Sequence, residues 1–219
     1  GFNHTILPLD KEENARLQIA WGIEDFQYHF NRDPEGMWLP ECAVNETVID
    51  LLSQAGIKFI ILSPWQCNAV ENEEGKIIEL GSNPAPYREP YILTGKRGGE
   101  ITAFFYEPSL ASGISFGHYL RNADSLYSTL LDIKNRDKSP IIHTATDGEI
   151  YGHHEPYGDM ALAALIKKVN DGDAFIFDNY GSYMAKHPAT KHAVLRKGEE
   201  GKGTSWSCSH GVSRWYKDC

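Results

Sequence analysis

The sequence predicts an α/β fold in which parallel strands alternate with helices, as a barrel or a doubly wound sheet. Short apolar stretches alternate along the chain with longer segments of three- and four-residue hydrophobic spacing, the order that parallel sheets require. The chain contains neither a Gly-x-Gly-x-x-Gly fingerprint nor a Gly-rich loop ending in Lys-Ser/Thr. A dinucleotide-binding sheet is therefore disfavoured.

Helices are predicted from hydrophobic spacing and end signals. Apolar residues three and four positions apart predict an amphipathic helix over 12–30. Asn45 is a suitable N-cap for a second helix, and Gly56 stands where the residue after its end belongs. Further helices are expected over 123–135 and over 159–169, the latter capped by Asp159.

Strands are predicted from short apolar runs bounded by turn residues. Five segments qualify, at 36–39, 57–62, 101–106, 140–146 and 174–177. Residues 71–99 are rich in Gly, Pro, Asn and charge, so we expect a long loop there, of the kind that often binds ligands in enzymes.

The composition excludes several classes of protein. The 219 residues include 21 Lys and Arg against 30 Asp and Glu, a net charge of −9, which argues against a nucleic-acid binder. With 41% hydrophobic residues the chain can bury a sizeable core. No run approaches the roughly 20 apolar residues of a membrane helix. We predict no nucleic-acid or membrane partner; the oligomeric state stays open.

The four cysteines, Cys42, Cys67, Cys208 and Cys219, lack the short paired spacing of zinc or redox motifs. We expect reduced, mostly buried thiols. The alternatives are a bridge between Cys208 and Cys219, or a metal site that these two form with His210. We predict no cofactor, no metal and a cytoplasmic location, although a signal peptide would lie upstream of this sequence.

Two acidic residues follow predicted strands and are candidates for catalysis. Glu41 comes after 36–39, and Asp147 comes directly after 140–146. In parallel barrels, catalytic groups collect at the carboxyl ends of strands. Two facing carboxylates are the minimum machinery for cleaving a glycosidic bond, one attacking the anomeric carbon and the other protonating the leaving oxygen. The alternative is that each carboxylate only caps a helix.

Aromatic residues near these acids favour a sugar-binding site. Trp38 precedes Glu41, and Trp206 and Trp215 lie in a polar, Ser- and Gly-rich segment where a buried strand is not expected. Because flat aromatic faces can stack on sugar rings, we expect these three residues and Tyr151 to bind substrate.

The segment 146–155 concentrates acids, glycines and histidines. In one interpretation, Asp147 is a general acid, and Glu149 and the histidines, His153 foremost, position the substrate. In a second, Asp147 and both histidines bind a hydrolytic metal. In a third, the histidines form a solvated turn. The metal interpretation ranks second, because adjacent histidines point in different directions and seldom bind one ion together.

Three further residues are candidates for the site. His4 and His210 are expected to contact substrate. Asp178, which follows the predicted strand 174–177, is the main rival to Asp147 as the second catalytic acid. Residues 180–183 come next and could line the same site.

Several motifs resemble those of glycoside hydrolase family 57. Trp-Leu-Pro-Glu at 38–41 resembles its nucleophile motif, and Asp-Gly-Glu-Ile-Tyr-Gly at 147–152 resembles its acid/base motif. The segments 3–9, 34–37 and 205–215 look like a little-characterised subgroup of that family. The resemblance spans nearly the whole chain.

The resemblance implies a (β/α)7 TIM-like barrel of the glycoside hydrolase/deacetylase type, and a retaining mechanism on α-glucans or related α-linked sugars. Glu41 would be the nucleophile and Asp147 the general acid/base, with water or a sugar hydroxyl as acceptor. The family's early His motif is absent, and we expect it upstream of Gly1. Residues 1–219 would then be the central and C-terminal part of one incomplete catalytic barrel, with a loop excursion at about 71–99.

Two alternatives to a glycosidase or glycosyltransferring enzyme are kept. One is a metal-dependent carbohydrate deacetylase on a related barrel. The other is a catalytically silent relative that binds oligo- or polysaccharide through its aromatic residues.

Overall fold

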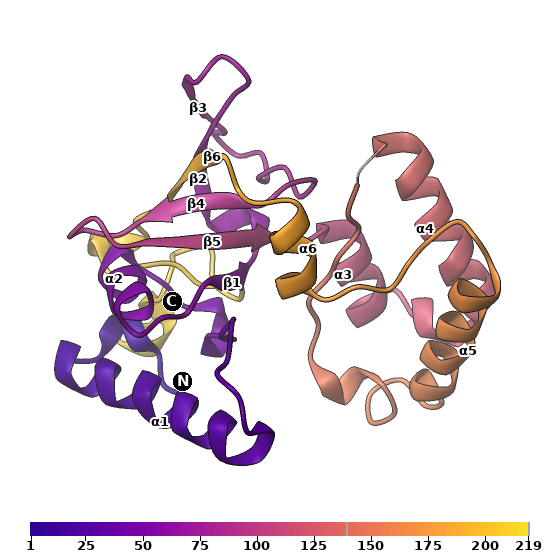
Figure 1. Cartoon of the computed structure of the whole chain (residues 1–219), viewed down its shortest axis with the longest axis horizontal. Helices are drawn as coiled ribbons and strands as arrows, with labels where there is room; N and C mark the ends of the chain where they lie inside the picture. The colour runs from indigo at the N-terminus through magenta and orange to yellow at the C-terminus, as the bar shows by residue number, and fades with distance from the viewer. Residues whose placement is uncertain (139, 219) are drawn as a thin grey trace. The chain divides into compact units, whose positions relative to one another are not determined.

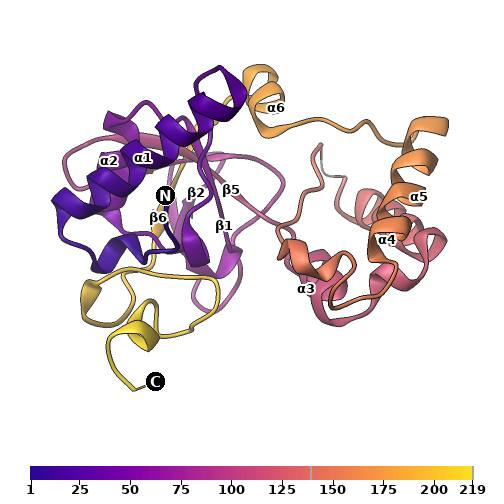
Figure 2. The ribbon, with the colours of Figure 1, turned by 90° about the horizontal axis from the view of Figure 1, so that it is seen from below.

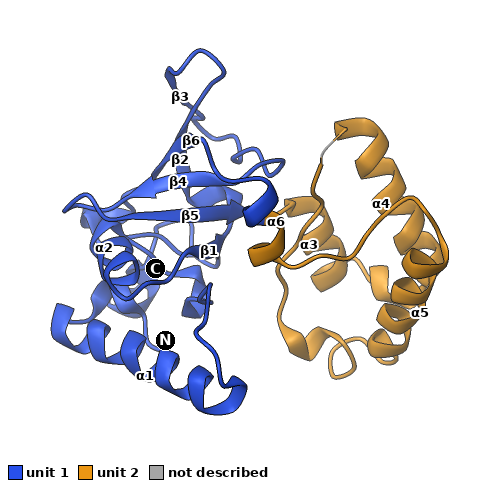
Figure 3. Cartoon of the chain, viewed as in Figure 1, with its two compact units in different colours: residues 1–105, 184–219 blue, residues 106–183 orange. Residues whose placement is uncertain are grey.

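The computed structural model describes residues 1–138 and 140–218 and divides the chain into two compact units (Figure 3). Unit 1 is Gly1–Phe105 together with the chain from Met184 onward, and unit 2 is Tyr106–Tyr183. Each unit is described by itself. None of the helices in the described part of the chain has both the length and the apolar character needed to cross a membrane.

Unit 1 is built on a six-stranded mixed sheet with the order β1-β5-β4-β6-β2-β3. β1 pairs in parallel with β5, and β4 with β6, whereas the other neighbours are antiparallel. The strands are β1 (Phe59–Leu62), β2 (Cys67–Glu71), β3 (Ile77–Glu79), β4 (Tyr91–Thr94), β5 (Glu100–Phe105) and β6 (Lys191–Leu195).

Two helices cover the sheet of unit 1. α2 (Glu46–Gln54) packs on β4 and β5, and α1 (Glu12–Phe30) packs against α2 (Figure 1). Together they bury a single apolar core, whose largest enclosed side chains include Ile19, Leu52, Ile60, Tyr91 and Phe105. The 3-10 turns of this unit are Leu7–Leu9, Pro40–Cys42, Pro64–Gln66, Glu199–Gly201 and Ser213–Trp215.

Unit 2 is helical. α4 (Ala123–Asp137) packs against α5 (Gly158–Asp171), and the 3-10 turn Tyr119–Arg121 contacts both of them and α3 (Pro108–Phe116) (Figure 2). A further turn, Gly148–Ile150, precedes α5, and α6 (Tyr180–Lys186) leads the chain back to unit 1.

Several elements confirm the sequence predictions. α1 matches the predicted helix 12–30, α4 matches 123–135 within two residues, and β1 and β5 occupy the predicted apolar runs. The predicted cap of α2 is also confirmed, since the Val48 main-chain N–H donates to Asn45 Oδ1 at 2.9 Å. Gly56 follows the helix with φ +80°, a conformation that glycine adopts at little cost.

Other element predictions are wrong. In the structure, 140–146 and 174–177 form no strand, and 36–39 contributes only an isolated bridge between Gly36 and Phe59. An apolar run becomes a strand only where a neighbour pairs with it, and Ile176 and Phe177 are exposed. The sheet is mixed rather than purely parallel, because β2 pairs antiparallel with β3 and β6, and β4 with β5. The loop predicted over 71–99 contains the strands β3 and β4, which the sequence did not indicate because Gly, Pro and Asn surround the short apolar run 91–93.

The predicted cap of α5 is wrong as well. The helix begins at Gly158 with Tyr157 at the N-cap position, and Asp159 lies in its first turn. A Cβ on Gly158 would lie 3.2 Å from both the Ile150 carbonyl oxygen and Leu120 Cδ1. The first residue of α5 therefore packs closely against the turn before it, and no described side chain caps the helix.

The cap of α2 provides a test of unit 1. Asn45 accepts from Val48 and also donates from Nδ2 to the Lys202 carbonyl at 3.2 Å. We expect Asn45→Ala to lower the free energy of unfolding by about 1–2 kcal/mol, because it removes the cap and the second hydrogen bond. Asn45→Asp keeps the cap acceptor and loses the donor, so urea unfolding should place it between the wild type and the alanine variant. Equal stability of all three proteins would contradict this role.

Candidate active site

Glu41 lies in an unusual main-chain conformation. It sits in the middle of the turn Pro40–Cys42 with φ 58° and ψ 18°, and Cys42 follows with φ 50°. Two successive non-glycine residues in the left-handed region are costly, and such strain is concentrated at functional sites. The Glu41 side chain is 25% exposed, so its carboxylate is accessible from solvent.

The Glu41 carboxylate is oriented by three side chains. Trp206 Nε1 donates to Glu41 Oε2 at 3.0 Å, and Ser207 Oγ donates to the same oxygen at 2.5 Å. His4 Nε2 lies 3.6 Å from Oε1. The structure thus brings His4, Trp206 and Glu41 together from distant parts of the sequence, and Glu41 caps no helix through its side chain.

Trp38 joins this cluster through an aromatic contact. Its ring packs edge-to-face on Trp206, with centroids 5.1 Å apart and an interplanar angle of 71°. Trp38 is 42% exposed and therefore presents apolar surface beside the carboxylate. Next to it lies a cavity of about 450 Å³, whose lining includes Trp65, Arg196, Trp206 and Ser207.

The buried side-chain amide of Gln66 links the turn that carries Glu41 to the segment that carries Trp206. Gln66 Nε2 donates to the Cys42 carbonyl at 2.7 Å and to Thr204 Oγ1 at 3.1 Å, while Gln66 Oε1 accepts from Ser63 N at 2.9 Å. The main chains of Val44 and Thr204 also exchange two hydrogen bonds of 2.9 Å. The residue after Glu41 is thus tied to the segment that carries Trp206. Sequence reasoning missed Gln66, because a single glutamine carries no pattern.

His210 and Trp215 lie farther along the same C-terminal segment. His210 is exposed and its ring Nδ1 lies 4.0 Å from Cys208 Sγ. Trp215 is half-buried, with the Arg214 guanidinium 5.5 Å from its ring centroid. Both residues remain candidates for substrate contacts.

The cysteines outside this segment are structural. Cys42 and Cys67 are fully buried and form no disulfide with a described residue, and burial raises the pKa of the Cys67 thiol to about 11, which disfavours the reactive thiolate at neutral pH. Cys208 is half-buried and forms no disulfide with a described residue. Its predicted alternative partner, Cys219, lies outside the described residues. Within 1–138 and 140–218, no three His, Cys, Asp or Glu side chains are grouped closely enough to hold a metal ion.

Asp147 lies in unit 2, at the start of the turn Gly148–Ile150. It is exposed, and its side chain makes no capping hydrogen bond, so the helix-cap alternative is not what the structure shows. The segment before it is not a strand, and the strand-end reason for choosing Asp147 therefore fails. Glu41 and Asp178 lose the same reason, because neither 36–39 nor 174–177 is a strand. Asp178 Oδ1 accepts from the main-chain N–H of Asn179 at 2.9 Å.

The other predicted residues of this motif surround Asp147 in sequence. Tyr151 is half-buried, and its hydroxyl lies 3.1 Å from Thr146 Oγ1. Glu149 is exposed and lies 3.8 Å from His154 Nε2, and the rings of His153 and His154 are 4.7 Å apart. These side chains are accessible, as a substrate-contacting motif requires.

A charged cluster that sequence reasoning missed lies directly after this motif. Glu155 is 6% exposed and accepts from Arg121 Nε at 2.8 Å, while its other oxygen lies 2.5 Å from His118 Nδ1. The hydrogen bonds from Arg121 and then His118 lower the pKa of the Glu155 carboxyl. Because the Glu155 main-chain N–H also donates to the Ile150 carbonyl at 3.2 Å, the cluster anchors the motif.

Solved structures similar to this chain define its fold class. The crystal structure of the branching enzyme from Thermococcus kodakaraensis superposes with a TM-score of 0.74 at 16% identity, covering 98% of this chain and 50% of that one. The 4-alpha-glucanotransferase from Thermococcus litoralis gives a TM-score of 0.68 at 18% identity, covering 94% of this chain and 30% of that one. The predicted α/β class, that of the TIM-like barrels, is confirmed.

The sequence profile of glycosyl hydrolase family 57 matches residues 1–195, and the chain belongs to this family. An alpha-amylase of Pyrococcus abyssi is 23% identical over 192 residues, which are 85% of this chain and 27% of the amylase. A 1,4-alpha-glucan branching enzyme of Thermococcus kodakarensis is 49% identical over 41 residues, 18% of this chain and 6% of the enzyme. The chain thus spans only a minor part of these curated relatives.

The hydrogen bonds of Gln66 should contribute to the free energy of unfolding. Gln66→Met keeps the side-chain volume and should lower the free energy of unfolding by about 2–4 kcal/mol, because buried partners lose their hydrogen bonds. Gln66→Glu would direct a carboxylate oxygen at the Cys42 carbonyl, and it should be less stable at pH 7 than at pH 5. Urea unfolding measures both effects. Gln27, which is exposed, gives the control Gln27→Met, expected within about 0.5 kcal/mol of wild type.

The Glu155 cluster predicts an acid-dependent stability. Because the folded state lowers the pKa of Glu155 below its ordinary value of 4.5, the ionised carboxylate stabilises the fold above pH 4.5, and this contribution is lost as the pH falls through the folded pKa. Glu155→Gln should therefore lower the melting temperature at pH 7 and converge with wild type in the acid range. Melting curves at several pH values measure this. Parallel curves for the two proteins would contradict it.

Proposed function

We propose that the protein is a retaining glycoside hydrolase or glycosyltransferring enzyme that acts on α-glucans or related α-linked sugars. Membership of glycosyl hydrolase family 57 supports this proposal, as do the names of the amylase, branching and glucanotransferase relatives. The observation that carries it is the Glu41 carboxylate, which is accessible, held in a strained turn and oriented by Trp206, Ser207 and His4.

In this mechanism, Glu41 is the nucleophile. An ionised Glu41 oxygen bonds to the anomeric carbon while the bond from that carbon to the leaving oxygen breaks. The hydrogen bonds from Trp206 and Ser207 fix one carboxylate oxygen. They leave the other, which His4 approaches, to face the substrate. Trp38 and Trp206 then provide aromatic surface for the sugar ring.

Asp147 is the general acid and base. It gives its proton to the leaving oxygen in the first step. In the second it takes a proton from the acceptor, water or a sugar hydroxyl, whose oxygen bonds to the anomeric carbon while the bond from that carbon to Glu41 breaks. Its side chain is exposed and makes no capping hydrogen bond, so a substrate can reach the carboxyl group. Glu149, Tyr151 and His153 are proposed to bind substrate beside it, and His210 and Trp215 from the C-terminal segment.

We also propose that both units belong to one catalytic domain. The proposed partner is a saccharide, and the proposed location is the cytoplasm. A metal-dependent deacetylase is not favoured by any observation in the described residues.

Replacing the two carboxylates tests the function. We expect Glu41→Gln to lower kcat on maltoheptaose about 10³-fold or more, because it removes the nucleophile. Asp147→Asn should lower kcat about 10²- to 10⁴-fold, the contribution of general acid catalysis. Product chromatography measures turnover, and circular dichroism checks that each variant folds.

Two exposed acids serve as controls, and several outcomes would contradict the proposal. Glu24→Gln on α1 and Asp132→Asn on α4 should leave turnover unchanged. Small and equal losses for all four variants would argue against catalysis by Glu41 and Asp147. Loss of activity on chelation with recovery on adding zinc would favour the deacetylase. Maltoheptaose binding without turnover, unaffected by Glu41→Gln, would favour a silent binding protein.

A further inference from the structure

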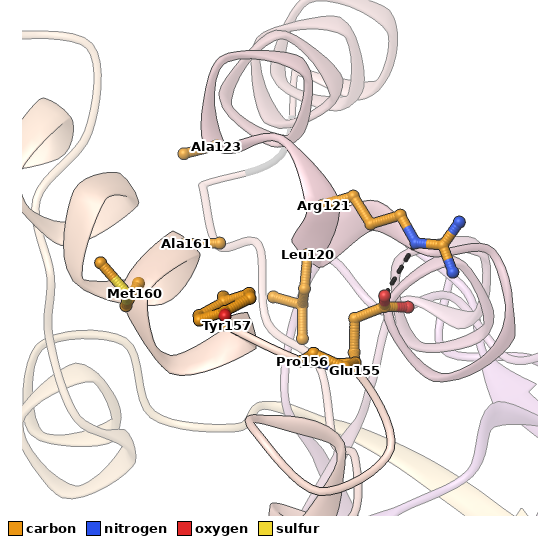
Figure 4. Close-up of a pocket in the computed structure, with 8 residues that line it drawn as sticks. All are labelled: Leu120, Arg121, Ala123, Glu155, Pro156, Tyr157, Met160 and Ala161. Atoms are coloured by element: carbon orange, nitrogen blue, oxygen red, sulfur yellow. Dashed lines mark hydrogen bonds and ion pairs between the residues drawn. The ribbon is translucent and has the colours of Figure 1, made fainter.

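A pocket in unit 2 lies outside the residues assigned to catalysis. It has a volume of about 730 Å³, within the range typical of small-ligand sites. Its walls come from the turn Tyr119–Arg121, the beginning of α4 and the segment 155–161 at the beginning of α5 (Figure 4). That segment follows the proposed acid/base motif at 147–152 in the sequence. It is also tied to the motif by a hydrogen bond, which the main-chain N–H of Glu155 donates to the Ile150 carbonyl.

One side of the pocket carries an aromatic ring that neither packing nor helix capping explains. Tyr157 is 76% exposed, adopts the left-handed conformation at φ 63° and ψ 16°, and makes no side-chain capping bond to α5. Glycine or asparagine suits this conformation, whereas a bulky residue there is strained. A tyrosine that is both strained and exposed indicates a function for its ring.

The other side of the pocket carries a guanidinium that one hydrogen bond anchors to a buried carboxylate. Arg121 Nε donates to the buried Glu155 carboxylate, and in the described structure this bond leaves both terminal nitrogens of Arg121 unengaged. Glu155 therefore holds the guanidinium in place while its remaining N–H donors stay available to a ligand. The Glu155 carboxylate, which His118 also contacts, offsets the charge of Arg121. The remaining Arg121 donors therefore suit the hydroxyl groups of a neutral polar ligand.

The two features define the ligand when they are taken together. Figure 4 shows the Tyr157 ring and the Arg121 guanidinium on either side of Leu120. A ligand that reaches both needs a flat apolar face for the ring, hydroxyl oxygens for the guanidinium, and enough length to cross the pocket. We propose that this pocket binds a segment of neutral α-glucan chain, with one glucosyl ring stacked on Tyr157 and hydroxyls accepting from Arg121. This inference rests on the proposed function for the substrate class.

Hydrogen–deuterium exchange with maltoheptaose tests the site. The Glu41→Gln protein is used so that the glucan is not consumed. We expect protection of peptides covering 118–123 and 155–161. Adding Tyr157→Asn should raise the maltoheptaose concentration for half-protection about tenfold, the size expected for one lost aromatic stacking contact. Tyr157→Phe should retain protection.

Two controls separate binding from folding. Tyr157→Asn should melt at or above the wild-type temperature, because asparagine tolerates the left-handed conformation. A lower melting temperature would assign Tyr157 a structural role and overturn the proposal. Phe116 is also highly exposed, at 82%, in the same unit, and Phe116→Ala should leave the exchange pattern in the pocket unchanged.

The remaining outcomes distinguish this inference from the proposed function. Protection confined to peptides around Glu41 and Trp206 would overturn the pocket and leave the proposed function intact. Protection nowhere would overturn both. Protection of the pocket by inorganic phosphate but not by maltoheptaose would make it an anion site and overturn the assignment to a neutral glucan.

Discussion

The buried carboxamide of Gln66 is the interaction on which the candidate nucleophile depends. Its donor and acceptor atoms reach the main chains of Cys42 and Ser63 and the hydroxyl of Thr204. These groups belong to segments separated by up to 162 positions in sequence (204 − 42). A buried amide with all partners satisfied specifies one arrangement, because any shift leaves a polar group unpaired. The placement of Glu41 beside Trp206 follows from this constraint.

The Gln66 contacts also explain how a strained turn persists. Glu41 and Cys42 both adopt positive φ values, a conformation that costs on the order of 1–3 kcal/mol per residue. The bond from Gln66 holds the Cys42 carbonyl, and the paired main chains of Val44 and Thr204 hold the next residues. Gly203 permits that pairing, since a Cβ there would lie 2.7 Å from the Val44 carbonyl oxygen. Contacts from the surrounding structure thus stabilise a main-chain conformation that Glu41 and Cys42 do not favour by themselves.

The sequence predicted the elements that depend on local signals. It failed for strands, because a strand forms only where a neighbouring strand pairs with it. The helix over 12–30 and the cap at Asn45 follow from side-chain spacing and one hydrogen bond. The runs 140–146 and 174–177 are apolar but have no partner strand, whereas Tyr91–Thr94 pairs despite its polar surroundings. Motifs identified Glu41 and its neighbour Trp38, but Gln66 and the Glu155 cluster depend on contacts between distant segments.

The left-handed conformations of Glu41 and Tyr157 bear on how this chain is shaped by selection. At both positions glycine or asparagine would fit the backbone better, so selection for stability alone would remove these two side chains. The roles proposed for these two residues account for their presence as a trade between stability and function. Under the proposed function, homologues with glycine or asparagine at position 41 would have lost the nucleophile. Homologues with the same replacement at 157 alone would keep the nucleophile and lose the proposed contact with an extended glucan.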